Sequence, residues 1–255
     1  MKPIYKPKGA AKEYGDLAIN VFTGCNHRCT YCYAPLILKR DREKFHSVVE
    51  PRKEVVEAAK RQINKERITG KLIHLCFCCD PYPAEVDTNS TRKIIKTIKE
   101  SGNNVQILTK GGKRALRDFD LLDGNDWFGV TITGGSLTSA KYEPNAAPLV
   151  EREESLKIAH NQGIKTWVSF EPVLDIAVVY RALKITDYVD LYRIGKLNYV
   201  PNNTDWAAFG TECERIAIEK NLNYYIKDGL RKIMNAKSQE VTCKMRSDFY
   251  GTQET

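Results

Sequence analysis

The sequence predicts an α/β fold in one domain, a partial and open (β/α)6 barrel of parallel strands that resembles an incomplete TIM barrel. Three observations lead to this prediction. The chain has 255 residues, a size that α/β barrels reach as a single domain. Short apolar segments alternate with helical patterns, as in βαβ units with right-handed crossovers. No Gly-, Pro- or Ser-rich linker divides the chain.

Each predicted strand is short and rich in Val, Ile, Leu or aromatic residues, as expected of strands that are covered on both faces. The six segments are residues 17–22, 73–78, 105–109, 128–133, 166–170 and 188–194. Six strands are two fewer than a closed barrel of eight needs, so we expect the barrel to be open.

Three helical patterns stand out between the predicted strands. Residues 52–63 and 91–100 each place their apolar side chains on one stripe. A third pattern, residues 150–162, ends at Gly163, a residue that favours the backbone conformation of helix C-termini. From these boundaries the expected division is an N-terminal extension, the barrel and a polar tail, at residues 1–16, 17–236 and 237–255.

The composition is that of a globular protein, with 42% hydrophobic and 28% charged residues, which excludes a largely disordered chain. No run of about 18 apolar residues is present, and the basic N-terminus has no apolar stretch behind it. We therefore expect a cytoplasmic protein without a membrane partner. The net charge of +8 is consistent with a polyanionic partner. Basic and aromatic residues between 224 and 250 suit nucleic-acid binding, although a solvated helix face has the same pattern.

Residues at the ends of the predicted strands are the first functional candidates, because chemistry in parallel α/β sheets gathers beyond the carboxyl ends of strands. Cys25, Asp80 and Lys110 follow the first three strands, Thr131 lies in the fourth, and Glu171 follows the fifth. The sequence thus predicts thiols, carboxylates and a cation on one rim of the barrel.

Two groups of three cysteines are the most unusual feature of the chain. In a reducing compartment, thiols bind metals, catalyse or are buried more often than they form disulfides. Cys25, Cys29 and Cys32 have the spacing to bind three irons of a 4Fe–4S cubane, which leaves the fourth iron open for a chelating cofactor. A zinc site that adds His27, or a set of inert buried thiols, would be the alternatives.

The Cys-x3-Cys-x2-Cys spacing, with Tyr31 before the last cysteine and the loop placed after a first barrel strand, resembles the radical S-adenosylmethionine (SAM) superfamily. The fuller string of residues 24–34, Gly-Cys-Asn-His-Arg-Cys-Thr-Tyr-Cys-Tyr-Ala, is similar to the branch of spore photoproduct lyase, often labelled DNA repair photolyases. Further matches extend along residues 17–200. The chain is shorter than spore photoproduct lyase, so the resemblance does not carry the same lesion over as the substrate.

The resemblance implies a 4Fe–4S cluster whose open iron binds the amino and carboxylate groups of SAM. Reduction by a flavodoxin- or ferredoxin-like electron donor then releases a 5′-deoxyadenosyl radical, which abstracts hydrogen from a substrate. By similarity, Cys25, Cys29 and Cys32 hold the cluster. Four further positions match residues that contact SAM in this superfamily, namely Tyr31, Tyr33, Lys110 and Thr131.

Two carboxylates on the rim are further candidates for binding the cofactor. Asp80 could accept from the ammonium of SAM in place of the usual Gly-Gly-Glu of the superfamily, although Asp before Pro81 also suits a turn. Glu171 could face the cofactor and pair with Arg193 across the mouth, or each could form a separate ion pair. Lys110 is a natural partner for a carboxylate, and a solvated lysine at a strand end is the alternative.

The second cysteine group, Cys76, Cys78 and Cys79, lies at the end of the second predicted strand. Strand alternation places Cys76 and Cys78 on one face, with Cys79 at the end of the strand. Spore photoproduct lyase has a cysteine in this region that donates a hydrogen atom to the product radical. The resemblance therefore implies a catalytic role for Cys79 or, as second choice, Cys78. Buried core thiols, or an auxiliary cluster with Cys213 or Cys243, are alternatives.

These observations together predict a radical SAM enzyme that acts on a nucleic acid or nucleotide. A radical SAM enzyme that acts on a peptide or small metabolite is the first alternative. A non-catalytic iron–sulfur or zinc protein is the second, and it would not need the residues expected around an open iron.

Overall fold

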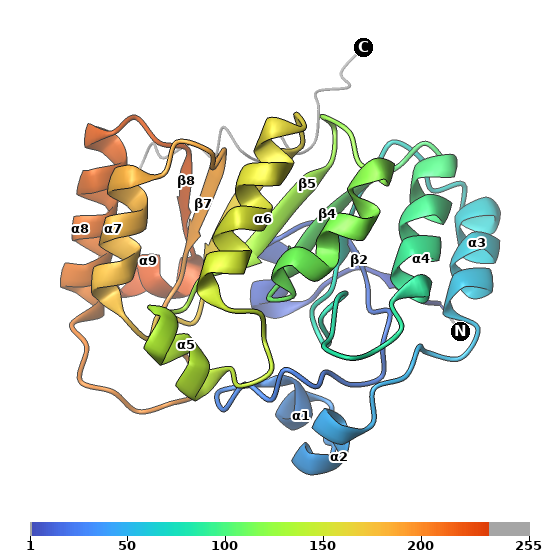
Figure 1. Cartoon of the computed structure of the whole chain (residues 1–255), viewed down its shortest axis with the longest axis horizontal. Helices are drawn as coiled ribbons and strands as arrows, with labels where there is room; N and C mark the ends of the chain where they lie inside the picture. The colour runs from blue at the N-terminus through green and yellow to red at the C-terminus, as the bar shows by residue number, and fades with distance from the viewer. Residues whose placement is uncertain (1, 235–255) are drawn as a thin grey trace.

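A computed structural model describes residues 2–234 and arranges them around one open sheet of eight strands in the order β1 to β8 (Figure 1). The first strand, β1, runs antiparallel to β2, and every later pair of neighbours is parallel. The strands are β1 Ile4–Tyr5, β2 Leu17–Ile19, β3 Leu72–Leu75, β4 Asn104–Thr109, β5 Trp127–Thr131, β6 Lys165–Phe170, β7 Leu191–Ile194 and β8 Tyr224–Ile226. The predicted single-domain, partial α/β barrel is confirmed, with seven parallel strands in place of six.

The two strands that the sequence did not reveal are β1 and β8, which have only two and three residues. β7 begins at Leu191, later than predicted, and β2 and β3 each end earlier than predicted, at Ile19 and Leu75. Beyond them a side chain replaces the ladder of the sheet, because Asn20 Oδ1 accepts from the backbone N–H groups of Phe77 and Cys78, both at 2.9 Å.

Helices between the parallel strands cover the outer face of the sheet (Figure 1). The α-helices are α1 Ala34–Ile37, α2 Arg42–Ser47, α3 Val55–Glu66, α4 Asn89–Glu100, α5 Ser136–Tyr142, α6 Leu149–Asn161, α7 Ile176–Ile185, α8 Trp206–Glu219 and α9 Asp228–Met234, and the 3-10 helices are Gly9–Glu13 and Gly112–Leu121. The three helices predicted from the sequence correspond to α3, α4 and α6. The short helices α1, α2 and α5 instead lie at the edge where the strands end.

The main core lies between the outer face of the sheet and the helices. Ile73, Ile107 and Val168 are fully or almost fully buried there, and each contributes about 1.5–3 kcal/mol of burial free energy. The inner face carries larger rings. The indole of Trp167 is buried inside the barrel, donates to the carbonyl of Ile107 at 3.0 Å, and needs a glycine opposite it. A Cβ on Gly129 would lie 2.3 Å from that indole.

The N-terminal segment packs against the inside of the barrel. The Tyr14 ring lies 5.6 Å from the His74 ring and 5.9 Å from that of Trp167, centroid to centroid. At the first strand, the Gln62 side chain forms two hydrogen bonds with the backbone of Ile4, at 3.0 and 2.9 Å. These contacts link the N-terminal segment to β3, β6 and α3.

No helix within residues 2–234 has the length and apolar character needed to cross a membrane. The predicted polar tail, residues 237–255, lies outside the described residues, as does most of the basic and aromatic C-terminal stretch. Three basic residues of that stretch are described, Lys227, Arg231 and Lys232, and the first two form ion pairs. Lys227 pairs with Glu171, and Arg231 pairs with Glu214 at 2.7 Å.

Candidate cofactor site and active site

The loop that carries the first cysteine group follows β2 and is held against α2. The backbone N–H of Cys25 donates to the carbonyl of Phe45 at 3.2 Å, and that of Cys32 donates to the carbonyl of Cys29 at 3.0 Å. Close approach requires glycine at position 24, because a Cβ there would lie 2.2 Å from the Phe45 carbonyl oxygen. The loop and α2 therefore form one packed unit.

A single arginine on α2 fixes the carbonyl groups around the thiols. Arg42 donates to the carbonyl oxygens of Cys29, Thr30 and Cys32, at 2.6, 2.8 and 3.1 Å. The ring Nδ1 of His46 lies 2.6 Å from the carbonyl oxygen of Cys25. These contacts use backbone groups of the loop, and none of the three cysteines is in a disulfide. The sulfur atoms also receive hydrogen bonds, from the backbone of His27 and Ala34 and from the Tyr31 hydroxyl.

The three thiols of this loop suit a metal cluster. Burial raises the pKa of Cys25, Cys29 and Cys32, that of Cys29 to about 11, and the nearby thiols add to the effect at Cys25 and Cys29. Only a positively charged ligand such as iron would hold all three as thiolates. Within the described part of the chain, no three His, Cys, Asp or Glu side chains converge on a single metal ion. A cubane instead bonds each cysteine to a different iron, so its ligands need not converge.

His27, the proposed fourth ligand of a zinc site, has partners at both ring nitrogens. Arg114 Nη2 lies 3.0 Å from Nε2, and Asp80 Oδ2 lies 3.5 Å from Nδ1. Burial lowers the pKa of His27 to about 4, so the ring is neutral. Its Nε2 then accepts from the Arg114 guanidinium, and its proton is on Nδ1, which faces the Asp80 carboxylate. This arrangement leaves neither nitrogen for a metal.

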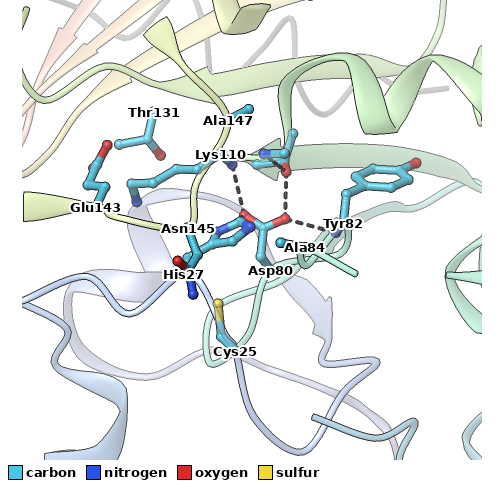
Figure 2. Close-up of polar contacts among 12 residues, drawn as sticks. Cys25, His27, Asp80, Tyr82, Ala84, Lys110, Thr131, Glu143, Asn145 and Ala147 are labelled. Atoms are coloured by element: carbon cyan, nitrogen blue, oxygen red, sulfur yellow. Dashed lines mark hydrogen bonds and ion pairs between the residues drawn. The ribbon is translucent and has the colours of Figure 1, made fainter. Parts of the chain in front are cut away.

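Asp80 lies at the centre of a set of hydrogen bonds between the ends of β3 and β4 (Figure 2). One carboxylate oxygen accepts from the Thr109 hydroxyl at 2.5 Å and from the backbone of Tyr82 at 2.8 Å, and the other accepts from the backbone of Lys110 at 2.8 Å. Burial opposes ionisation, but His27 and these donors lower the pKa of Asp80 overall. The geometry favours a role for Asp80 in positioning Lys110 over direct binding of an ammonium group.

The side chain of Lys110 extends towards Glu143, close to Thr131 (Figure 2). Its Nζ lies 5.7 Å from the centre of the Tyr31 ring and forms no hydrogen bond or ion pair with any residue from 2 to 234. Burial lowers the pKa of Lys110, but Cys29 and Glu143 raise it more, so the amine stays charged. A buried ammonium with this freedom is suited to bind the carboxylate of a ligand.

Glu143, at the C-terminal end of α5, joins the site although its role could not be predicted from the sequence. It accepts from the hydroxyl groups of Tyr31 and Thr133, the latter at 3.1 Å, and pairs with Arg152 at 2.6 Å. Arg152 also donates to the carbonyl oxygen of Thr131 at 3.0 Å. The only signal in the sequence is an acidic residue, followed by proline, within the stretch that resembles radical SAM enzymes.

Glu171 lies on the opposite side of the barrel mouth, after β6. Its Oε2 accepts from Lys227 Nζ and, at 3.1 Å, from the hydroxyl of Tyr14. Lys227, which follows the unpredicted strand β8, is thus an ion-pair partner of Glu171 that the sequence analysis did not consider. Arg193 lies over the Tyr14 ring, 4.9 Å from its centre, and donates to the carbonyl of Glu13.

The second cysteine group divides into a pair and a single residue. Because β3 ends at Leu75, the strand alternation expected for Cys76 and Cys78 does not apply, and Cys76 contacts Cys79 instead. Cys79 Sγ also accepts from the backbone of Phe22 at 3.5 Å. Burial raises the pKa of Cys76 and opposes ionisation of Cys79, but the hydrogen bond from Cys76 lowers the pKa of Cys79.

Cys78 is half-buried and faces the first cysteine loop. Its thiol interacts electrostatically with Cys32 and with the hydroxyl of Tyr33. That hydroxyl donates to the carbonyl of Phe77 at 2.8 Å, while the Tyr33 ring keeps 39% of its surface exposed. Burial raises the pKa of Cys78 to about 11, so the residue is a neutral thiol with a hydrogen atom to give. Cys213, by contrast, packs in the core on α8.

Comparisons with known sequences found a matching family profile and relatives of this chain. The sequence profile described as "Radical SAM superfamily" matches residues 19–192. An uncharacterised protein of Methanocaldococcus jannaschii is 30% identical over 205 residues, which cover 77% of this chain and 75% of the relative. An uncharacterised protein of Acidianus two-tailed virus is 28% identical over 67% of this chain, and the match spans 63% of that protein.

Two solved structures are similar in fold. Spore photoproduct lyase complexed with dinucleoside spore photoproduct superposes with a TM-score of 0.63 at 14% identity, over 87% of this chain and 78% of that one. SuiB from Streptococcus suis, bound to S-adenosylmethionine, superposes with a TM-score of 0.57 at 12% identity, over 86% of this chain and 52% of SuiB.

Proposed function

This chain belongs to the radical SAM superfamily, and from that premise we propose that it is an enzyme acting on a nucleic acid or nucleotide, with Cys78 as its hydrogen donor. Enzymes of this superfamily use a 4Fe–4S cluster and SAM, which supply a 5′-deoxyadenosyl radical when reduced. Cys25, Cys29 and Cys32 would hold the cluster, and the tasks of the remaining site residues follow from their contacts.

The observation that carries the proposal is the position of Lys110 beside this loop. Its ammonium lies near Cys29 and Glu143, is charged, and forms no ion pair within the described residues. The carboxylate of SAM supplies the partner that Lys110 lacks, and Asp80 holds the backbone of Lys110 in place. Glu143 fixes the Tyr31 ring beneath the same ammonium. By similarity to the superfamily, Thr131 and Tyr33 would contact the rest of the cofactor.

Cys78 fits the role of hydrogen donor better than Cys79. Cys79 is tied to Cys76 and to the backbone of Phe22, whereas Cys78 faces Tyr33 and the cluster loop. In the proposed step, homolysis of the Cys78 S–H bond moves one hydrogen atom to the substrate-derived radical and leaves a thiyl radical on Cys78. One electron from a low-potential carrier protein and one proton restore the thiol.

The substrate class rests on charge and on the fold. The chain carries a net charge of +8, which favours a polyanion. The likeness to spore photoproduct lyase, a protein solved with a dinucleoside photoproduct, supports a nucleotide unit as the substrate. The mouth between Lys110 and Lys227 also carries two partly exposed rings that suit base stacking, Phe77 and Tyr33.

The test uses protein whose cluster has been reconstituted anaerobically. Reduced protein is expected to convert SAM to 5′-deoxyadenosine, and deuterated oligonucleotides are expected to transfer label to that product. Electrophoretic retardation of DNA or RNA is expected to fall steeply with salt. If deuterated peptides or small metabolites give the label and oligonucleotides do not, the substrate class is wrong. If a fully loaded cluster gives no 5′-deoxyadenosine, the enzyme assignment itself fails.

A further inference from the structure

We propose that the surface formed by α1 and α2 is the docking site of an acidic, low-potential electron-carrier protein. This surface, the α1–α2 face, is defined by Leu36 and Ile37 on α1, Lys39 and Arg40 in the connection, and Lys44 on α2. The inference rests on the proposed function, because a radical SAM enzyme must receive electrons at its cluster. It adds where on this chain the carrier binds and why.

The centre of the α1–α2 face is apolar and exposed. Leu36 keeps 68% of its surface exposed and Ile37 52%, whereas Ala34 on the same helix is buried. These two adjacent, branched aliphatic residues lie outside the core clusters of the described residues. Exposed apolar groups with a polar surround are the usual centre of a protein–protein interface.

The rim of the face is basic. Residues 28–48 contain five arginines and lysines against two acidic residues. Both acids have local partners, since Asp41 Oδ1 accepts from the backbone of Lys44 at 2.8 Å and Glu43 pairs with Arg28 at 3.0 Å. Lys39, Arg40 and Lys44 are exposed to solvent. Their charges are therefore available to attract an acidic partner and to speed its association.

The face is tied directly to the candidate cluster loop. Arg42, on α2, bonds to the carbonyls of Cys29 and Cys32, and Arg40 donates to the carbonyl of Thr23 at 2.6 Å. Cys32 is itself half-buried and lies two residues before α1. In Figure 1, α1 and α2 lie side by side at the edge where the strands end. A partner seated here would lie closer to the loop than one on the outer helices α3 or α4.

An acidic protein fits this face better than a nucleic acid does. Nucleic acids bind surfaces on which lysine and arginine side chains contact the phosphates and aromatic side chains stack on the bases. Here the centre of the face is aliphatic, and the only exposed ring nearby, Tyr33, directs its hydroxyl inward to the carbonyl of Phe77. Aliphatic residues surrounded by lysines instead match an acidic protein with an apolar centre.

The test measures binding of a flavodoxin, as an acidic carrier, to the reconstituted enzyme by calorimetric titration, without SAM. Three proteins are compared: the wild type, the double variant Lys39→Glu/Lys44→Glu, and a matched control, Lys60→Glu/Lys65→Glu, on the distant helix α3. The face variant is expected to bind at least tenfold more weakly and to lose most of the salt dependence. The α3 control is expected to bind like the wild type. A further variant, Leu36→Ser, is expected to weaken binding with the salt dependence intact.

Two outcomes would overturn the docking site. Equal affinity of the face variant and the wild type, or equal losses in the face variant and the α3 control, would show that the face is not the site. Loss of oligonucleotide retardation by the face variant, with flavodoxin binding unchanged, would assign the face to a nucleic acid instead. Cleavage of SAM driven by dithionite serves as the separate measure of the proposed function, and we expect it to be the same in all variants.

Discussion

The two cysteine groups of this chain contain three cysteines each but have different surroundings. In the first group, Arg42 and α2 bind the backbone of the loop, and none of the three cysteines is in a disulfide or bound to another cysteine of the group. In the second group, Cys76 and Cys79 bind each other, and only Cys78 faces the mouth. The comparison teaches that the number of thiols does not set their function. The surroundings differ instead, because Arg42 binds the carbonyl groups of the first loop, whereas two thiols of the second group bind each other.

The largest effect is expected where the first group is broken. Replacing Cys29 with Ala removes one of three cluster ligands, so the iron content should drop to a small fraction of the wild-type value. Formation of 5′-deoxyadenosine should then fall below detection. Iron analysis and product chromatography after anaerobic reconstitution measure both effects. Cys78→Ala is the matched control and should retain full iron. Equal iron loss in both variants would contradict the claim that only the first cysteine group binds the cluster.

The second group is tested by its effect on product formation. Cys78→Ala should cleave SAM at the wild-type rate but yield little product, because the substrate-derived radical lacks its hydrogen donor. Wild-type enzyme in D2O should place deuterium in the product through the exchangeable thiol, and Cys78→Ala should lose that label. Cys79→Ala should behave like the wild type. Loss of label in Cys79→Ala alone would return the role to the thiol that the sequence had favoured.

The cation beside the first group gives a smaller effect. Lys110→Gln should weaken SAM binding by about 10- to 100-fold, since a charged hydrogen bond contributes about 1.5–3 kcal/mol. Lys110→Arg should recover part of this affinity. Lys113→Gln, which alters an exposed residue paired with Glu154, is the control and should have no effect. Titration of the cluster spectrum with SAM measures the affinity; unchanged binding in Lys110→Gln would exclude contact with the cofactor.

The smallest effect concerns the strand that leads into the second group. Burial lowers the pKa of His74 to about 3, so the folded protein keeps this ring neutral while the unfolded chain protonates it near pH 6.5. Stability from this residue is thus complete above pH 6.5 and decreases as the pH falls. Urea unfolding of the apoprotein measures this effect. Between pH 7 and 5, the free energy of unfolding should fall by about 2 kcal/mol less in His74→Gln than in the wild type. Identical pH profiles would mean that His74 is charged or exposed.

Much of the fold could be predicted from the sequence, because buried parallel strands and amphipathic helices leave strong local patterns. The strands β2 to β7 and the helices α3, α4 and α6 were recognisable in this way. The two edge strands were not, since two or three residues carry too little pattern. Their absence from the prediction had a consequence for the site, because Lys227 at the end of β8 is the partner of Glu171.

The candidate site was predictable only in part, for a related reason. Spacing alone identified Cys25, Cys29 and Cys32, since these ligands are close in sequence. Glu143 and Arg152 could not be found this way, because their ion pair forms only when α5 and α6 are folded against β5. The choice between Cys78 and Cys79 depended on where β3 ends, and the side chain of Asn20, far away in sequence, determines that point.

The central claim is that three cysteines hold a cubane whose remaining iron is open to SAM. Electron paramagnetic resonance of the reduced, reconstituted protein tests it most directly, with and without added SAM. We expect a single 4Fe–4S signal per chain whose shape changes when SAM is added and which is lost in Cys29→Ala. A mononuclear or four-thiolate centre, with a spectrum indifferent to SAM, would contradict the claim.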